Sequence, residues 1–339
     1  MRILPKALAA VAALSLGLTA CSSSGGAATP TGTATPTGGA TAAPGAHAPL
    51  NKPEDLAVLD QIKVVETEPA KGPTLTFVTT PIAVTATAVK VLTPGTGPKA
   101  TTDSLVTVKQ SLYVGGTGKL VDNGFTSAKP ASTFYTGDQQ TISGLLTALV
   151  GAQKGSRIVF AIPPAEAFGD KGQTAASIGP KDDLVVVADV TGVTLPQQVA
   201  TGPAVAPVAG QPTVAFDATK GPAITVPKTA APKALVSQPL IDGAGPVVKA
   251  GQSLIVNYTG ALYTDGSVFD SSWTRKAHFG FQSNAGAVIP GWDKGLVGKK
   301  VGSRVLLVVP PADGYANQAK QGIPANSTLV FVVDILAAA

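Results

Sequence analysis

The chain has 339 residues, of which 44% are hydrophobic and only 13% are charged, and its formal net charge is +5. Its longest basic run is Lys299-Lys300, so the sequence argues against a nucleic-acid-binding stripe. One cysteine and two histidines cannot build a disulfide framework or a His/Cys metal site, and no P-loop is present, so we expect neither metal nor cofactor.

The first 21 residues are typical of a targeting segment. Arg2 and Lys6 precede or flank the start of an apolar run over residues 7–18, which is short for a membrane span. The following Leu18-Thr19-Ala20-Cys21 resembles the lipobox of bacterial lipoproteins. The resemblance implies that Cys21 is lipidated and anchors the protein to the extracytoplasmic face of the cell membrane. A cleaved signal peptide with an incidental cysteine is the alternative.

Residues 22–50 carry no charged residue and consist mostly of Ser, Gly, Ala, Thr and Pro. Such a composition cannot bury a core, so we expect a disordered tether here. His47 lies in this stretch and is expected to be solvated.

An internal repeat divides the remaining chain into two like domains, because residues 142–168 align without a gap with residues 289–315. We expect the first domain over residues 51–195 and the second over residues 213–339, joined by an uncharged linker over 196–212. The best matched motifs are Gly155-Ser156-Arg157 with Gly302-Ser303-Arg304, and Pro163-Pro164 with Pro310-Pro311.

Each copy carries a strand-like piece ahead of its recognisable core, Thr74–Val78 in the first and Ile224–Val226 in the second. Two interpretations remain open. The piece is either an extra strand of the domain's sheet or an arm that packs against it.

The second copy contains one short predicted helix. Pro290 suits the first helical position, and Gly298 suits a left-handed turn after the last. Between them Ile289, Trp292 and Leu296 fall on one face, which needs an apolar cover.

That cover is a predicted antiparallel sheet. The strand-like runs are rich in β-branched residues, and Asp265-Gly266 is a strong turn signal. The first copy retains the apolar helix face as Ile142, Leu145 and Leu149. We therefore predict an α+β fold with two domains, each a sheet wrapped on one short helix. The runs are Leu254–Tyr258, Arg304–Val309 and Leu329–Ile335.

Several residues of the second copy, in order and spacing, resemble the binding site of the FKBP family of peptidyl-prolyl cis-trans isomerases. The resemblance covers about residues 233–339. It implies two FKBP-like domains, the second close to the family pattern. The residues that carry it are Tyr258, Phe269-Asp270, Arg275, Phe279, Phe281, Val288-Ile289, Trp292, Tyr315, Ile323 and Phe331.

The resemblance also implies roles for these residues. Trp292 would be the floor under a proline ring, and the Tyr315 hydroxyl and the Ile289 N–H would donate to carbonyls. Asp270 would lie beside the bond that turns, steadied by Arg275 or Tyr258. The remaining substrate-binding walls would be Tyr258, Phe269, Phe279, Val288, Ile323 and Phe331.

The first copy departs from this pattern. Leu145 stands at the tryptophan position, Val121-Asp122 at the Phe-Asp pair, Lys109 or Gln110 at Tyr258, and Phe168 at Tyr315. We therefore expect the second domain to catalyse and the first to bind or space.

The second copy departs from the family at two loops. His278 stands where a proline is common and Ala287 where an acidic residue is common, while Lys320 replaces a frequent histidine. We expect His278 to lie on an exposed loop and not in a Ser-His-Asp triad, because no nucleophile elbow accompanies it.

The predicted function is prolyl isomerisation in exported or cell-envelope proteins, with X-Pro segments as partners and rapamycin-type inhibitors as ligands. Two alternatives from other classes are a non-enzymatic chaperone that binds proline-containing segments and an envelope scaffold.

Overall fold

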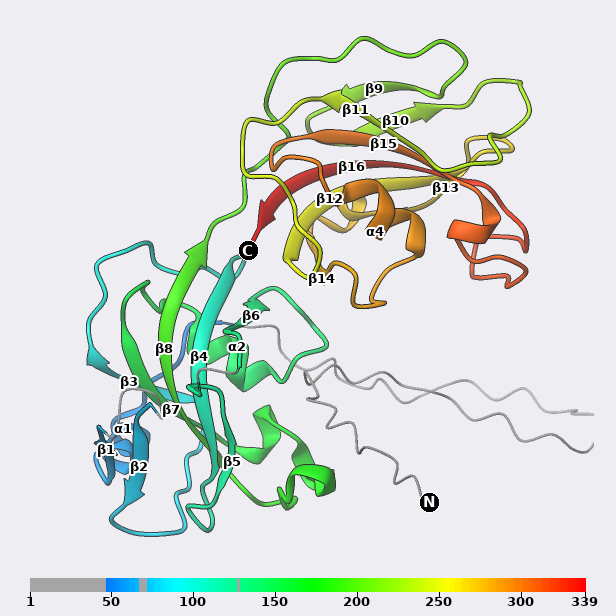
Figure 1. Cartoon of the computed structure of the whole chain (residues 1–339). Helices are drawn as coiled ribbons and strands as arrows, with labels where there is room; N and C mark the ends of the chain where they lie inside the picture. The colour runs from blue at the N-terminus through cyan, green and yellow to red at the C-terminus, as the bar shows by residue number, and fades with distance from the viewer. Residues whose placement is uncertain (1–46, 67–71, 127–128) are drawn as a thin grey trace, which may run out of the picture.

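The computed structural model describes residues 47–66, 72–126 and 129–339, which form two domains lying next to each other (Figure 1). The targeting segment, Cys21 and residues 22–46 of the expected tether lie outside the described residues. Each domain holds one six-stranded antiparallel sheet, one two-stranded hairpin and a short central helix.

In the first domain the large sheet has the order β3-β7-β8-β4-β5, and β6 also pairs with β4. Short 3-10 turns η1 (Pro164–Glu166), η2 (Gly169–Lys171) and η3 (Thr174–Ala176) connect β7 to β8. The other elements are α1 (Pro53–Leu59), β1 (Ile62–Val65), β2 (Thr74–Phe77), β3 (Ala88–Thr93), β4 (Leu105–Val114), β5 (Leu120–Asn123), β6 (Ser132–Tyr135), α2 (Ser143–Leu149), β7 (Arg157–Ile162) and β8 (Leu184–Thr194).

The second domain repeats this topology, with the order β11-β15-β16-β12-β13 and with β14 pairing β12. Its elements are β9 (Thr213–Asp217), β10 (Gly221–Thr225), β11 (Val236–Ile241), β12 (Ser253–Leu262), β13 (Val268–Ser271), α3 (Ser272–Arg275), β14 (Phe279–Gln282), α4 (Pro290–Leu296), β15 (Arg304–Val309), η4 (Pro311–Asp313) and β16 (Leu329–Ala338).

Strand register confirms the predicted repeat. Arg157 on β7 faces Asp189 on β8, and Arg304 on β15 faces Asp334 on β16. The α+β fold and the tandem of like domains are confirmed, while the domain limits at residues 195 and 213 stay predictions.

Helix α4 begins at Pro290 and ends at Leu296, and Gly298 beyond it takes a left-handed φ of +86°. Trp292 and Leu296 are buried against the sheet, with Ile289 packed beside them. The predicted helix is therefore confirmed. In the first domain Ile142, Leu145 and Leu149 pack in the same way around α2.

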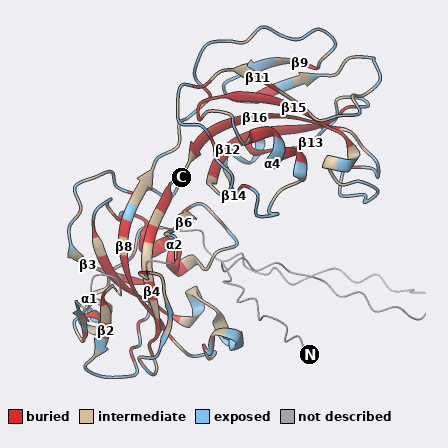
Figure 2. Cartoon of the chain, in the orientation of Figure 1, coloured by how far each residue is buried: buried red, intermediate tan, exposed pale blue. Residues whose placement is uncertain are grey.

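The two hairpins, β1–β2 and β9–β10, are packing arms and not extra strands of the large sheets. Val214 and Ile224 of the second hairpin pack against Leu306 and Val332, whereas the alternate residues of those strands face α4. Because side chains of a strand alternate between faces, the hairpin and the helix cover opposite sides of the sheet. Figure 2 shows the buried strands between these two layers.

A buried ion pair lies under the second hairpin. Arg304 Nε and Nη2 donate to the two Asp334 carboxylate oxygens at 2.6 and 2.7 Å, and the side chains are only 6% and 2% exposed. The Phe216 ring covers the Arg304 guanidinium, with 3.5 Å from its centroid to Cζ. Since both charges are removed from water, loss of either partner would leave the other charge buried and unpaired.

Residues 197–205, which follow β8, lie along the second domain. They connect to β16, to β11 and to the turn before β15 through backbone donors. The bonds run from the N–H of Gln197 to the Leu336 carbonyl (3.0 Å), Ala200 to Asp334 Oδ2 (3.2 Å), Thr201 to the Gly302 carbonyl (2.9 Å) and Val205 to the Leu240 carbonyl (2.9 Å).

Asp183, just before β8, gives a pH-dependent test of the first domain. The residue is 5% exposed, and its Oδ2 accepts from the Val84 N–H at 2.7 Å. Burial raises the pKa of Asp183 to about 6. The folded state therefore binds this proton more tightly than the unfolded state, and the free energy of unfolding falls as pH rises from about 4 to 6.

We expect Asp183→Asn, which keeps an acceptor for Val84, to lack this loss and to be more stable than the parent by about 2–3 kcal/mol at pH 7. Urea unfolding at pH 4, 5, 6 and 7 measures the difference between variant and parent. A difference that does not change with pH contradicts this assignment.

Candidate functional site

Trp292 lies at the centre of an aromatic cluster in the second domain. Its ring centroid is 5.1 Å from Tyr258, 5.3 Å from Phe331, 5.6 Å from Phe281 and 6.1 Å from Phe279. All four pairs are edge-to-face with interplanar angles of 65° to 88°, the arrangement that the aromatic quadrupole favours. Trp292 is 4% exposed, so the surrounding side chains cover almost all of it.

A sixth ring extends the cluster over the edge of the sheet. Phe269 packs edge-to-face against Phe331 at 5.7 Å. Both rings lie close to the backbone of β12 at Gly260, where a Cβ would be 2.7 Å from Phe269 and 2.8 Å from Phe331. The glycine therefore leaves the space that the two rings fill.

Strand pairing brings these residues together from distant parts of the chain. In the register of the sheet Gly260 on β12 faces both Phe331 on β16 and Asp270 on β13, and Val256 faces Phe279 on β14. Helix α4 packs on the same face. The rings of Tyr258, Phe269, Phe279 and Phe331 are therefore held on strands, which position side chains more rigidly than loops.

A polar trio stands at the edge of the aromatic cluster. The Tyr258 hydroxyl donates to Asp270, and Arg275 donates to the other Asp270 oxygen and, at 3.1 Å, to the Tyr258 oxygen. Asp270 and Arg275 are 38% and 44% exposed, so their ion pair adds little stability. Its effect is to fix the direction in which the Asp270 carboxylate points.

Burial, and then the hydrogen bond to Asp270, raises the pKa of Tyr258 to about 12. Burial, and then the charge of Asp270, also raises the pKa of Tyr315. Both phenols are therefore protonated at neutral pH. The Tyr258 hydroxyl already donates its hydrogen bond to Asp270.

Two donors remain available to a ligand. Among the described residues, neither the Tyr315 hydroxyl nor the Ile289 N–H has a hydrogen-bond acceptor. The Trp292 Nε1 is buried and also has no partner in the described part of the chain. The Tyr315 ring packs against the aromatic cluster, and Lys320 Nζ lies 5.8 Å from its centroid.

The structure brings the predicted site residues of the second domain into one place. Tyr258, Trp292, Ile323 and Phe331 are buried in a single core cluster, and Phe269, Phe279, Val288, Ile289 and Tyr315 pack against it. Asp270 and Arg275 join through the polar trio. Their roles in turnover stay predictions.

The first domain lacks the polar trio. Gln110 occupies the register position of Tyr258, and its Oε1 is buried without a partner among the described residues. Asp122, the counterpart of Asp270, is paired with Lys129 instead. Leu145 fills the place of Trp292. The domain keeps its core and loses the polar trio and the tryptophan ring.

Sequence reasoning missed the environment of His278. This residue is not on an exposed loop: its side chain is 17% exposed, and its Nδ1 lies 2.6 Å from Asp103 Oδ2 of the first domain. No local pattern could have signalled this partner, because the two residues are 175 positions apart.

The first domain has a surface recess whose counterpart in the second domain is covered. A recess of about 520 Å³ in the first domain is lined by Thr93, Gly155-Ser156-Arg157 and Asp189. The matching residues of the second domain, Gly302-Ser303-Arg304 and Asp334, are covered by residues 197–205. The recess is thus distinct from the aromatic cluster.

Within the described residues no helix is long and apolar enough to cross a membrane. In the same part of the chain no three His, Cys, Asp or Glu side chains gather where they could hold a metal ion.

These features define a class: a two-domain protein with a sheet-and-helix aromatic site that offers hydrogen-bond donors. A sequence profile of the FKBP-type peptidyl-prolyl cis-trans isomerases matches residues 97–187 and 245–336. Because the two matches cover more than half of the 339 residues, the chain belongs to the FKBP-type peptidyl-prolyl cis-trans isomerase family and carries two family domains.

Characterised relatives are similar to parts of the chain. The FK506-binding protein of Streptomyces anulatus is 39% identical over 118 residues, which are 34% of this chain and 95% of that protein. The FKBP-type peptidyl-prolyl cis-trans isomerase FkpA of Escherichia coli K12 is 43% identical over 102 residues, 30% of this chain and 37% of that protein.

Two solved structures are similar to parts of the chain. The three FKBP domains of wheat FKBP73 align with 75% of this chain and 95% of that chain at 20% identity and a TM-score of 0.32. Escherichia coli FkpA aligns with 31% of this chain and 47% of that chain at 41% identity and a TM-score of 0.29.

Gly260→Ala tests the packing of the site. The added Cβ would displace the Phe269 and Phe331 rings, so we expect a loss of about 1–3 kcal/mol in the free energy of unfolding. Urea unfolding measures it. The matched control is Gly192→Ala on β8, where the Cβ would meet only the Thr107 side chain at 3.2 Å, with an expected loss below about 1 kcal/mol. Equal losses for the two variants would contradict the expected crowding.

Proposed function

We propose that the second domain catalyses cis-trans isomerisation of X-Pro bonds in exported or cell-envelope proteins. The observation that carries this proposal is the contrast between the two copies. The second has Trp292, the polar trio and the Tyr315 hydroxyl, whereas the first keeps the fold with other side chains at these positions, namely Leu145, Gln110 and Phe168.

The chemistry needs no acid, base or nucleophile, since no covalent bond is made or broken. The barrier of roughly 18–20 kcal/mol comes from the partial double bond of the peptide, which is lost when the bond twists. A catalyst must hold the twisted amide better than the planar one. An apolar site favours the twisted form because that form is less dipolar and depends less on water.

In this mechanism the proline ring lies on Trp292, between Tyr258 and Phe331. The Ile289 N–H and the Tyr315 hydroxyl donate to peptide carbonyls on either side of the bond. Asp270, held by Tyr258 and Arg275, lies next to the bond that rotates. The remaining rings exclude water, which strengthens each of these polar contacts.

The first domain would act as a binding or spacing module. Its apolar helix face is intact, but Phe168, which stands at the position of Tyr315, has no hydroxyl to donate, and the polar trio is absent. Rapamycin-type inhibitors would accordingly bind the second domain and not the first.

We further propose that lipidation of Cys21 holds the protein at the extracytoplasmic face of the cell membrane. The support is the sequence alone: a basic start, a short apolar run and Leu18-Thr19-Ala20-Cys21. Exported proteins that fold at this membrane would then be the substrates.

Trp292→Leu and Tyr315→Phe test the catalytic site in the full chain. We expect Tyr315→Phe to lower kcat/KM about fivefold to tenfold, the value of one hydrogen bond, and Trp292→Leu to lower it more than about tenfold. The assay is isomerisation of a short X-Pro peptide. Tyr263→Phe is the control, since this tyrosine is buried on the opposite face of the sheet.

Parent-like rates in both folded variants would refute the assigned roles. A folded parent that binds proline-containing peptides without accelerating their isomerisation would favour the chaperone alternative.

Cys21→Ser tests the anchor. Because acyl chains contribute about 0.8 kcal/mol per buried CH₂, removing their attachment point should shift the protein from the membrane fraction to the soluble fraction of a bacterial host. Fractionation followed by immunoblotting measures this shift, and Trp292→Leu, which keeps Cys21, is the control. Unchanged membrane association of Cys21→Ser would overturn the proposed lipid anchor.

A further inference from the structure

The two domains meet through equivalent strands. In the first domain β6 pairs with the start of β4, and in the second β14 pairs with the start of β12 in the corresponding register. Strand β14 carries Phe279 and Phe281, which both pack against Trp292. The contact between domains therefore lies directly behind one wall of the aromatic site.

The centre of this contact is apolar and dry. Leu105 of the first domain and Ile255, Leu336 and Ala337 of the second form one cluster, and each is 0–1% exposed. Tyr135 packs against the same cluster. Such complete burial indicates a stable contact between the domains and not a transient one.

Tyr135 lies against the backbone of Gly280. A Cβ at position 280 would be 2.2 Å from Tyr135 Cδ1, so only a glycine admits the ring at this distance. Gly280 stands between Phe279 and Phe281. The Tyr135 ring thus covers the outer face of the strand whose inner face lines the site.

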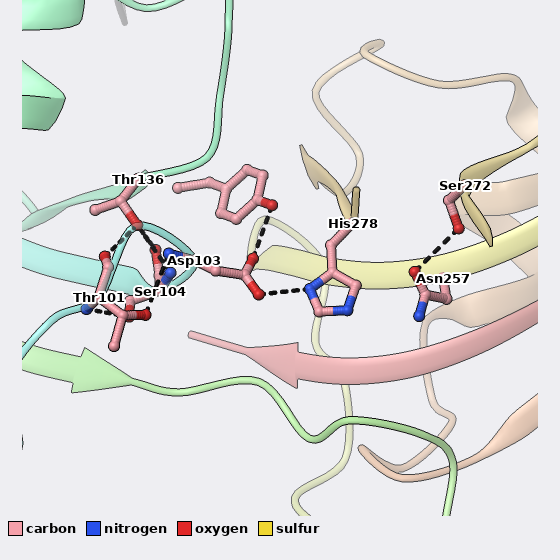
Figure 3. A network of polar contacts seen from close by, with 8 residues as sticks. Thr101, Asp103, Ser104, Thr136, Asn257, Ser272 and His278 are labelled. Atoms are coloured by element: carbon pink, nitrogen blue, oxygen red, sulfur yellow. Dashed lines mark hydrogen bonds and ion pairs between the residues drawn. The ribbon is translucent and has the colours of Figure 1, made fainter. Parts of the chain in front are cut away.

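Asp103 contacts the residue that directly precedes β14. Its Oδ1 accepts from the Tyr135 hydroxyl at 2.8 Å, and its Oδ2 lies 2.6 Å from Nδ1 of His278, the residue before β14 (Figure 3). Burial raises the pKa of Asp103, but its hydrogen bonds with His278 and Tyr135 outweigh that effect and lower it overall. The carboxylate is therefore charged at neutral pH and accepts from both partners.

The loop that carries Asp103 is itself held in place. Asp103 N–H donates to Thr101 Oγ1 at 3.2 Å, Thr101 N–H to Ser104 Oγ at 2.9 Å, and Ser104 N–H to Thr136 Oγ1 at 2.8 Å. Figure 3 shows this network beside His278. The first domain thus presents Asp103 and Tyr135 as a preformed surface.

We propose that Tyr135 and Asp103 of the first domain are positioning residues for the site of the second domain. They hold β14, and with it Phe279 and Phe281, against Trp292. Strand β14 has only four residues and pairs along one side with β12, so its outer face depends on this cover. This inference rests on the proposed isomerase activity of the second domain.

The test uses the full chain and three variants. Tyr135→Ala removes the ring from Gly280, Tyr135→Phe keeps the ring and removes the hydroxyl, and Tyr113→Phe is the matched control. Tyr113 is buried in the first domain, where its hydroxyl accepts from the Leu75 N–H, and it lies in a different core cluster from the domain contact.

We expect Tyr135→Ala to raise KM for an X-Pro peptide about tenfold with a smaller change in kcat, and to weaken rapamycin-type binding by a similar factor. Tyr135→Phe should restore most of the loss. Tyr113→Phe should lower thermal stability and leave KM unchanged. An active parent whose KM is unaltered by Tyr135→Ala overturns the inference.

Hydrogen exchange tests the same contact without reference to turnover. Tyr135→Ala should accelerate exchange of the β14 amides that pair with β12, and Tyr113→Phe should not. If the parent neither isomerises peptides nor binds inhibitor, the proposed function fails. In that case exchange decides the positioning role, and unchanged β14 protection refutes it.

Discussion

The packing of a two-turn helix against a sheet is the constraint on which each domain depends. A helix of seven residues cannot persist alone, because nucleation costs more than so few hydrogen bonds return. Helix α4 therefore exists only because Trp292 and Leu296 are buried against β15, β16 and β12. The same burial places the indole among rings from three strands, β12, β14 and β16. Trp292 therefore serves both the fold and the candidate site.

The first domain shows which part of this arrangement is structural. Leu145 satisfies the same constraint around α2 with an aliphatic side chain, and the sheet, the hairpin and the Arg157–Asp189 pair all persist. What disappears is the polar trio, with Gln110 in place of Tyr258. A core needs only a side chain of suitable size and apolarity at the helix face, whereas hydrogen-bond donors need particular atoms at particular positions. One copy can therefore keep the packed core while it loses the hydrogen-bonding side chains of the site.

Local signals explain why much of this was predictable from sequence. Pro290 and Gly298 set the helix limits through backbone geometry, and the spacing of Ile289, Trp292 and Leu296 set its buried face. The polar trio was accessible only through the order of Tyr258, Asp270 and Arg275 and its resemblance to a known family.

Contacts between distant segments left no such signal. The choice between strand and arm for the β9–β10 hairpin depends on how Val214 and Ile224 meet Leu306 across the sheet. The place of Tyr135 depends on a glycine in the other domain. Neither contact produces a periodic pattern in the sequence. For the same reason His278 was expected on an exposed loop, whereas it is hydrogen-bonded to Asp103.

The segment over residues 197–205 has a consequence for the integrity of the chain. It belongs by connectivity to the first half but is hydrogen-bonded to β16 and β11 of the second, while residues 206–210 beyond it are exposed. After a protease cut at that exposed stretch, the N-terminal fragment would still carry residues 197–205, which pack on the second domain. The two fragments would stay associated through this segment after the backbone is cut. The covalent link between the halves and their noncovalent association are therefore separate properties.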